Sequence, residues 1–407
     1  MRKMSKIKEK AKAAKEKKAL YGTDVDLAAF KSKATEHAYQ DSLEKIPPDS
    51  QRGMTEAGIV LSEEGRAGSY IQMDHSPVHC SIREEGVEIL PIVEALKRYD
   101  GLEDYWWQAM AVDADKYTAH AELELHNGYF IRVSKGVKAL FPVQACLYLG
   151  EEGIAQHVHN IIIAEEGSEL HVITGCTTAP NLARALHIGV SEFYVKRGAT
   201  LTFTMIHNWG EEVAVRPRTA VWVEEGGTYL SHYVCMKPAR SLQTDPTVRL
   251  LGKGAVTRLN TILVAGKGSE MDVGGRVHLE APDTKAEVVS RTISTGGNII
   301  SRGLLVGYVP GVKAHLECNG LMLSETGYIR AIPELDGRIA GVEMSHEAAV
   351  GKISRQEIEY LMARGISEAD ATALIVRGFL RVEMEGIPAE LKKEIDRAVE
   401  ESGKSLM

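Results

Sequence analysis

Hydrophobic and polar residues alternate along the middle of the chain in short runs separated by glycine. The run Leu201–Ile206 is a clear example, with an apolar side chain at every second position. Alternation with a period of two is the pattern of a β-strand that has one buried face. From about residue 119 to residue 350 such runs follow one another with almost no helical periodicity, so this region is predicted to be mainly β.

A weak internal repeat accompanies these runs. Glycine, a small residue, any residue and an apolar residue recur at Gly167–Leu170, Gly198–Leu201 and Gly227–Leu230, with related copies at Gly254 and Gly268. The intervals cluster at roughly 14 residues or at twice that number. Fixed turns with glycine between β-runs are what a coiled β-solenoid requires, so we expect a solenoid over residues 119–350. A β-sandwich or barrel is the alternative.

The regions on either side of this core have the composition or the apolar spacing of helices. Residues 1–65 begin with a Lys/Ala-rich stretch and continue with a second helical composition over Asp26–Glu44. Residues 66–118 form a mixed α/β transition, which reads as a strand and then a helix over Gly86–Asp100. Residues 351–407 return to helical spacing, so the predicted core is flanked by N- and C-terminal helical domains.

Three helices are predicted in the C-terminal region. The first begins at Ser354, with Glu357 as its capping-box partner, and ends at Gly365. The second covers Ser367–Gly378, and the third begins near Pro388. Helices this short are marginal alone, so we expect them to pack on the β-core or on a partner.

Charge and composition exclude several classes of protein. The net charge of −8 argues against general nucleic-acid binding, despite the lysine-rich start of the chain up to Lys18, whose role stays open. No apolar run approaches the length of a membrane span, and no signal peptide is visible. Five scattered cysteines without a CxxC pair suit a reducing compartment, so we expect a cytoplasmic protein.

Motifs of the common enzyme classes are missing from the sequence. There is no GxxxxGK[ST] phosphate loop, no complete dinucleotide fingerprint and no GxSxG elbow. No flavin motif is readable either, so a flavin requirement stays open. These absences remove several common enzyme classes.

Two histidines raise the alternative of a cupin-like metalloenzyme. His157 and His159 lie on one side of a predicted strand, and Glu165 follows. A metal site needs at least three convergent ligands, and the second half of a cupin motif is not evident. Edge or surface histidines are the simpler interpretation.

Two of the five cysteines are candidates for chemistry. Cys176 follows Gly175 at the end of an alternating run, where a thiol in a turn would be reachable and could accept a sulfur atom as persulfide. The simpler interpretation is a small buried hydrophobic residue. Cys80, Cys146 and Cys235 have no comparable neighbours and are interpreted as packing residues.

Cys318 is followed by a second group of candidate ligands, which begins at Glu343. In a strand, Glu343, Ser345 and Glu347 share one face and His346 lies on the other. Thiolate, carboxylate and imidazole together could hold iron or a nascent Fe–S cluster weakly. A permanent cluster usually has four cysteines, so such a sparse set indicates transient occupancy.

The run Met344–Ser354, continued by Tyr360–Leu380, closely resembles the C-terminal signature of the SufB/SufD family of iron–sulfur cluster assembly proteins. Gly175–Thr177, the Asn208–Trp209 pair and the Cys318 segment match as well, and the resemblance spans roughly residues 120–400. It implies a right-handed parallel β-helix between helical domains, which agrees with the solenoid expected from the repeat.

The resemblance also implies roles for individual residues. Cys176 matches a cysteine that receives sulfur, and Cys318 matches one used in cluster assembly near a dimer interface. Glu347 matches a proposed ligand of SufB, and His346 matches a histidine of SufD. Ser345 departs from the second glutamate of SufB, and Glu343 is the residue on the same face that could substitute for it.

The resemblance implies a scaffold for a transient Fe–S cluster, of the 4Fe–4S rather than the 2Fe–2S type, and not an enzyme in its own right. The implied partners are a SufC-like ABC ATPase and a second SufB/SufD protomer, either another copy of this chain or a paralogue, while the sulfur donor stays open. A structural SufD-like partner without a cluster is the main alternative. The expected ATPase contacts are Ile353, Ile358, Tyr360, Leu361, Arg364, Ile375 and Phe379.

Overall fold

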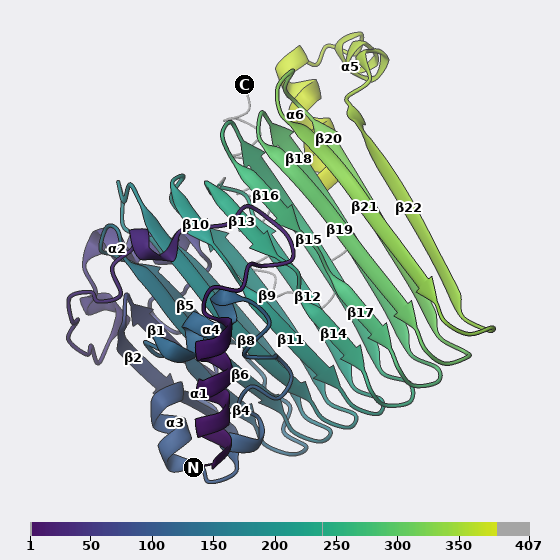
Figure 1. Ribbon diagram of the computed structural model, residues 1–407. Coiled ribbons are helices and arrows are strands. Elements are labelled where there is room, and N and C mark those ends of the chain that lie inside the picture. Colours follow the sequence, from purple (N-terminus) through teal and green to yellow (C-terminus); the bar gives the residue numbers. More distant parts are fainter. Residues whose placement is uncertain (1, 238, 381–407) are drawn as a thin grey trace.

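The computed structural model describes residues 2–237 and 239–380, and these residues form a β-solenoid of about eight turns (Figure 1). Each turn of the chain contributes strands to two sheets that face each other. Strands of successive turns pair in parallel, as in β7 with β9 and β6 with β8. The predicted mainly β solenoid is therefore confirmed, and the sandwich alternative is wrong because a sandwich does not repeat one rung.

Sheet I of the described chain has ten strands. Equivalent positions in neighbouring rungs pair along it, as in Glu169 with Thr200, Thr200 with Thr228 and Lys313 with Glu343. In spatial order its strands are β2 (Ser76–Ile82), β1 (Gly68–Met73), β5 (Val143–Leu149), β7 (Glu169–Thr178), β9 (Thr200–Asn208), β12 (Thr228–Cys235), β15 (Val256–Gly266), β18 (Lys285–Thr295), β20 (Lys313–Met322) and β22 (Glu343–Lys352).

Sheet II has twelve strands in the described chain, and several of its rungs bend midway. The bends divide three rungs into the pairs β10/β11, β13/β14 and β16/β17. The first pair aligns along the longer β8, the last along the longer β19, and β13/β14 lie between them. The strands are β3 (Val87–Pro91), β4 (Tyr129–Val133), β6 (Ala155–Ala164), β8 (Ala185–Val195), β10 (Val213–Val215), β11 (Arg218–Val223), β13 (Ser241–Thr244), β14 (Thr247–Leu250), β16 (Glu270–Val273), β17 (Arg276–Leu279), β19 (Asn298–Gly307) and β21 (Tyr328–Gly337).

The repeated glycines form the corners between the two sheets. Gly167, Gly198 and Gly254 have φ between +64° and +71°, a region that other residues rarely adopt. In the third copy of the repeat the positive φ falls on Gly226 rather than on Gly227. Two corners per rung explain why the motif recurs both at a short interval and at twice that interval.

The space between the two sheets, called the lumen below, is filled by side chains from alternate strand positions. Phe193 of β8 packs there against Phe203 of β9, with ring centroids 4.7 Å apart. The buried apolar cluster of the lumen extends from Tyr70 in the first rung to Cys318 in β20. One continuous core therefore connects the two cysteines that the sequence singles out.

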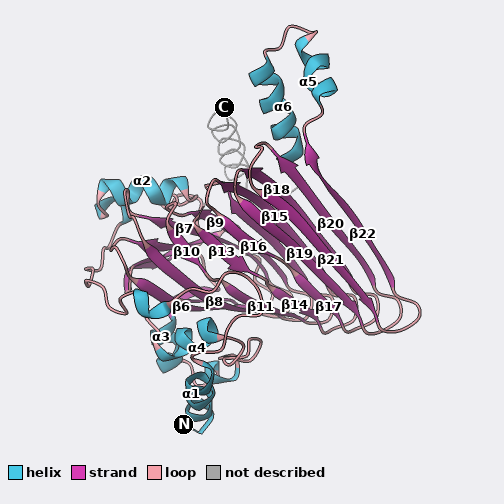
Figure 2. Cartoon of the chain, turned by 45° about the horizontal axis from the view of Figure 1, so that its top comes forward, coloured by secondary structure: helices cyan, strands magenta, loops and turns pink. Residues whose placement is uncertain are grey.

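Four α-helices of the N-terminal part pack on the solenoid at two places (Figure 2). The helices α1 (Arg2–Ala14), α3 (Ile92–Arg98) and α4 (Lys116–Leu123) lie on sheet II, whereas α2 (Pro48–Glu56) lies across sheet I. The strand and helix predicted over residues 86–100 are present as β3 and α3.

The helical prediction for Asp26–Glu44 is wrong. The stretch Asp26–Glu44 contains only the short 3-10 turns η1 (Leu27–Ala29) and η2 (Leu43–Lys45), because its backbone is held against the solenoid, for example by Lys31 N–H donating to Gly153 O. A third such turn is η3 (Leu102–Asp104). Residues 66–118 contain both strands and helices, and β1 pairs in parallel with β5 and supplies a rung.

The C-terminal helices α5 (Arg355–Met362) and α6 (Glu368–Leu380) follow the last rung. The N–H of Asp370 donates to Ser367 Oγ at 3.1 Å, as predicted for the start of α6. Ser354 precedes α5 without a side-chain cap, so the predicted capping box does not form. Val376 and Leu380 pack on the outer face of sheet I, and the helix predicted near Pro388 lies outside the described residues.

Candidate functional site in the solenoid lumen

Cys176 lies in β7 with its side chain in the lumen, and none of it is exposed. Burial raises the pKa of its thiol well above the ordinary value, and Cys146 on the neighbouring strand adds to that rise. The sequence placed this cysteine in a reachable turn, but the turn comes later, at Asn181 with φ of +64°. Cys176 is therefore a lumen residue that needs an opening before a donor can reach it.

Helix α2 covers the end of sheet I where Cys176 lies. A side chain at Gly175 would place its Cβ 2.4 Å from the carbonyl oxygen of Ala57, so the glycine permits a close approach rather than a turn. Glu56 at the end of α2 accepts hydrogen bonds from Lys237 at 2.7 Å and from Asn208 at 3.3 Å. These contacts fasten α2 across β7, β9 and β12.

The register of sheet I places His207 of β9 beside Cys176, and Cys235 of β12 beside His207. The His207 ring lies in the lumen, with Nδ1 2.7 Å from the Tyr233 hydroxyl. Its Nε2 is buried and has no hydrogen-bond partner in the described chain. Sequence reasoning missed this grouping, although adding the spacing of Gly167 and Gly198 to the position of Cys176 leads to His207.

Cys318 lies in β20 at the far end of the same lumen and is 2% exposed. Burial raises the pKa of its thiol, and hydrogen bonds with Ser290 and Ser301 oppose part of that rise. Its Sγ lies 4.0 Å from the Ser301 hydroxyl. Five rung steps separate β7 from β20, which corresponds to about 24 Å at the usual strand spacing.

A row of polar and soft side chains leads from Cys318 back to β7, the strand that carries Cys176. In the register of sheet I the residues in line with Cys318 carry mostly hydroxyl groups, with one thioether, namely Ser290, Thr261, Tyr233, Met205 and Thr174. A cavity of about 50 Å³ lies along this row and is lined by Met205, Tyr233 and Thr261 among others. The lumen thus contains unfilled space between the positions of Cys176 and Cys318.

The candidate ligands of the last rung divide between two faces. Glu347 pairs with Glu317 and His346 pairs with Leu316, so His346 shares the lumen face with Cys318 and Glu347 lies on the outer face. Glu343 is on the outer face too, in an ion pair with Lys313 at 2.8 Å. Within the described part of one chain, no three histidine, cysteine or acidic residues converge in a way that could hold a metal ion.

The last rung is open. In the described chain β22 ends sheet I and β21 pairs only with β19, so both strands present a free edge. The rung exposes large apolar side chains, including Tyr328, Leu335 and Val350. Free edges with exposed apolar residues are typical of surfaces that pair with another chain.

The residues of the cupin alternative do not converge. His159 Nε2 lies 2.9 Å from the buried carboxylate of Glu192, and its ring stacks on Trp106. His157 is buried nearby, but Glu165 follows eight residues later, about 26 Å along an extended strand.

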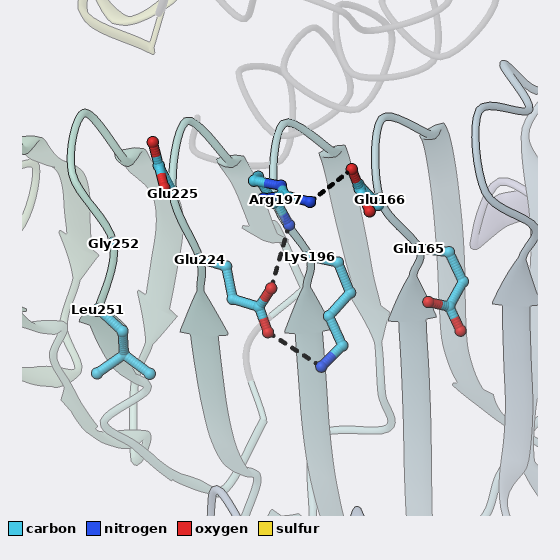
Figure 3. A pocket seen from close by; sticks show the side chains of 8 residues that line it. All are labelled: Glu165, Glu166, Lys196, Arg197, Glu224, Glu225, Leu251 and Gly252. Carbon is cyan, nitrogen blue, oxygen red and sulfur yellow. Dashed lines mark hydrogen bonds and ion pairs between the residues drawn. The ribbon is translucent and has the colours of Figure 1, made fainter.

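Glu165 instead lines a surface groove of about 440 Å³ at one corner of the solenoid (Figure 3). There Lys196 and Arg197 form ion pairs with Glu224 and Glu166 on neighbouring corners. The groove is lined mainly by charged side chains that form ion pairs between neighbouring rungs, and it contains no histidine.

The residues expected to contact an ATPase differ in exposure: two are exposed and five are half-buried. Ile353 and Phe379 are half-buried against the apolar cluster that α6 forms with sheet I. Tyr360 and Arg364 of the α5 region are exposed, and the guanidinium lies 3.5 Å from the centre of the tyrosine ring. Ile358, Leu361 and Ile375 are half-buried. Exposed Met362 and Leu374, which the sequence did not single out, extend this apolar surface.

No helix among the described residues has the length and apolar character needed to cross a lipid bilayer.

The described chain is thus a parallel β-solenoid with buried thiols in its lumen and an open final rung, and comparison with known proteins gives its family. Residues 147–379 match the family model described as SUF system FeS cluster assembly, SufBD core domain. An iron–sulfur cluster assembly SufBD family protein of Methanothermobacter thermautotrophicus is 47% identical over 98% of both chains. The chain belongs to the SufBD family of iron–sulfur cluster assembly proteins.

Other relatives with the same family description are more distant in coverage or identity. The protein of Archaeoglobus fulgidus is 48% identical over 88% of this chain and 96% of its own length. That of Staphylococcus haemolyticus is 30% identical over 90% of this chain and 80% of its own length.

Proposed function

We propose that this chain is a scaffold on which a transient Fe–S cluster, of the 4Fe–4S type, is assembled from incoming iron and sulfur. The observation that carries the proposal is the shared lumen of Cys176 and Cys318, with a polar row and a cavity between them. Sulfur is taken up at Cys176 and passes along the lumen to Cys318. The chain is not an enzyme itself, and iron and sulfur are its cargo.

The cluster site is completed by a second protomer. One chain carries Cys318 of β20 and His346 of the last rung on the lumen face, and Glu347 and Glu343 of the last rung on the outer face. A partner that pairs with the free edges of β21 and β22 would add its own ligands to those of this chain. We propose that two copies of this chain form a homodimer, and pairing with a SufB/SufD paralogue is the alternative. We also propose that the solenoid winds in the right-handed sense and is flanked by helical domains, as in the family.

The exposed surface of α5 and α6 is proposed to bind a SufC-like ABC ATPase. When two ATPases close on ATP, they move the C-terminal helices of both protomers. Because α6 packs on the outer face of sheet I near Leu321 of β20, such a movement reaches the strand that carries Cys318. The shift would open Cys318 to iron.

Anaerobic reconstitution with iron and sulfide tests the scaffold role. The wild-type protein should gain visible absorption and bound iron, the Cys318→Ser variant should not, and Cys80→Ser should behave as wild type because Cys80 lies outside this site. A cluster that forms equally on Cys318→Ser would contradict the proposal.

A structural SufD-like role is the second candidate. It is favoured by the division of Cys318 and Glu347 between opposite faces of one chain. If neither the wild type nor the variant binds iron while the ATPase still docks, this second role is the correct one.

A further inference from the structure

Uptake of sulfur at Cys176 requires a thiolate, because the thiolate and not the thiol is the nucleophile. Burial opposes ionisation of this thiol. Cys146 on the neighbouring strand adds to this effect, and no nearby charge among the described residues offsets it. Another group in the lumen must therefore take the proton, and its position is fixed by the register of sheet I.

The group beside Cys176 on the next rung is the imidazole of His207. Burial lowers the pKa of His207 well below its ordinary value, so the ring is neutral and has one unprotonated nitrogen. One nitrogen is held 2.7 Å from the Tyr233 hydroxyl. The other is buried without a partner in the described chain, an unusual state for a polar atom in a folded core.

Cys235 lies on the other side of His207, one rung further, and provides an internal comparison. Its thiol donates to the carbonyl oxygen of Lys237 at 3.5 Å. In the described chain the Cys176 thiol has no such acceptor. Of the two cysteines that neighbour His207 in the register of sheet I, Cys176 is therefore the one whose thiol is unengaged in the described chain, and it is not hydrogen-bonded to Nε2.

We propose that His207 is the general base for Cys176, an inference that rests on the proposed role of Cys176 as sulfur acceptor. The S–H proton of Cys176 moves to Nε2 as its sulfur attacks the outer sulfur of a persulfide donor. A new S–S bond forms on Cys176 and the donor's S–S bond breaks. The imidazolium then returns the proton to the departing donor thiolate, so a persulfide and a thiol exchange one sulfur atom without any oxidant.

Tyr233 completes the arrangement. With the proton on Nε2, the Nδ1–H of the ring donates to the tyrosine oxygen, which fixes the ring plane while the proton moves. The other titratable groups that face this part of the lumen are Tyr129 of β4, His187 of β8 and Cys235 of β12, and Cys146 of β5 lies nearby on the outer face of sheet I. None of these is charged at neutral pH, so the transferred proton stays paired with the thiolate.

The test uses glutathione persulfide as the sulfur donor and follows the gain of one sulfur atom on the Cys176 peptide by mass spectrometry. His207→Gln keeps a polar side chain of similar size but removes the base. We expect it to slow loading about a hundredfold at neutral pH, the usual effect of a missing general base. Its loading rate should also rise about tenfold per pH unit, as ionisation of a free thiol requires, whereas the wild-type rate should level off.

Cys235→Ser is the matched control, since it alters the other neighbour of His207, and it should load Cys176 at the wild-type rate. Thermal unfolding verifies that each variant is folded. If the His207→Gln protein is folded and loads sulfur with the wild-type rate and pH profile, His207 is not the general base, whereas the role of Cys176 as sulfur acceptor is unaffected. If wild-type Cys176 takes no sulfur even in a Glu56→Ala background that loosens α2, the acceptor role itself is wrong, and the inference falls with it.

Discussion

The first and last rungs of the solenoid are built from the same kind of strand, yet they end the lumen differently. Every residue of β1 is buried, because β2 pairs with one of its edges and α2 lies nearby. No residue of β22 is buried, and its outer edge is free in the described chain. The comparison shows that rung geometry sets where a side chain points, while the neighbouring element decides whether it is sealed or available.

Core packing should separate the two regions most strongly. Phe193→Ala removes a ring that packs on Phe203 and Tyr229 in the sealed part of the lumen, and it should lower the free energy of unfolding by about 3–5 kcal/mol. Val350→Ala in the last rung should change it by less than about 0.5 kcal/mol, because Val350 is 46% exposed. Urea unfolding measures both, and similar losses would show that the last rung is sealed too.

Acid should loosen the sealed end before the open one. Burial alone would raise the pKa of Glu63, but hydrogen bonds from Ser69, Ser81 and His79 outweigh it and lower the pKa to about 2. A carboxylate with a depressed pKa stabilises the fold above its unfolded value near 4.5, and this contribution is lost as pH falls from about 4.5 to 2.

Glu63→Gln should therefore cost about 1.5–3 kcal/mol at neutral pH, the range for hydrogen bonds to a charged group, and should flatten the dependence of stability on acid. Glu347→Gln, at an exposed position of the last rung, is the control and should leave the profile unchanged. Unfolding midpoints between pH 2 and pH 7 test this prediction. If the stability of Glu63→Gln and that of the wild type depend on pH in the same way, the lowered pKa of Glu63 does not stabilise the fold.

Association through the open end should be the next largest effect. Changing both Leu335 and Val350 to lysine places charges on the free edges of β21 and β22, so self-association should weaken at least tenfold, or by about 1.4 kcal/mol. Leu140→Lys is the control, since Leu140 is also apolar and exposed but lies far from this rung. Sedimentation equilibrium that shows the same association for all three proteins would exclude the last rung as the interface.

The smallest effect concerns access to Cys176. Glu56→Ala removes the carboxylate that holds α2 to Lys237, an exposed ion pair of a kind that contributes roughly 0.2–1 kcal/mol. Alkylation of Cys176 should then become about two- to fivefold faster, as local opening becomes more frequent. Glu166→Ala removes a comparable ion pair at a distant corner and should not alter the rate. An unchanged rate in Glu56→Ala would mean that α2 is not the cover.

The sequence predicts the repeating rungs of the solenoid well, but it predicts poorly the segments that pack against them. Gly167, Gly198 and Gly254 each mark a corner, because positive φ is a local requirement that glycine satisfies wherever it occurs. The path of Asp26–Glu44 could not be predicted in this way, since its backbone partners lie on solenoid corners that are distant in sequence, as for Lys31 and Gly153.

The candidate site divides along the same line. The strand pattern correctly places Glu343 and Glu347 on one face and His346 on the other. It does not reveal which face Cys318 shares, because that depends on the lengths of β21 and of the two corners that connect it to β20 and β22. Gly175 likewise suggested a turn, whereas its meaning lies in the approach of Ala57 from a helix distant in sequence.

The regular pairing of equivalent positions from rung to rung also limits how such a protein can change in length. Inserting or deleting one residue within a strand would turn the lumen side chains beyond it outward. Adding a whole turn would preserve every facing direction and move Cys318 one strand spacing, about 4.8 Å, farther from Cys176. The distance between the two thiols can therefore change only in steps of one strand spacing, because the solenoid can be lengthened only by complete turns.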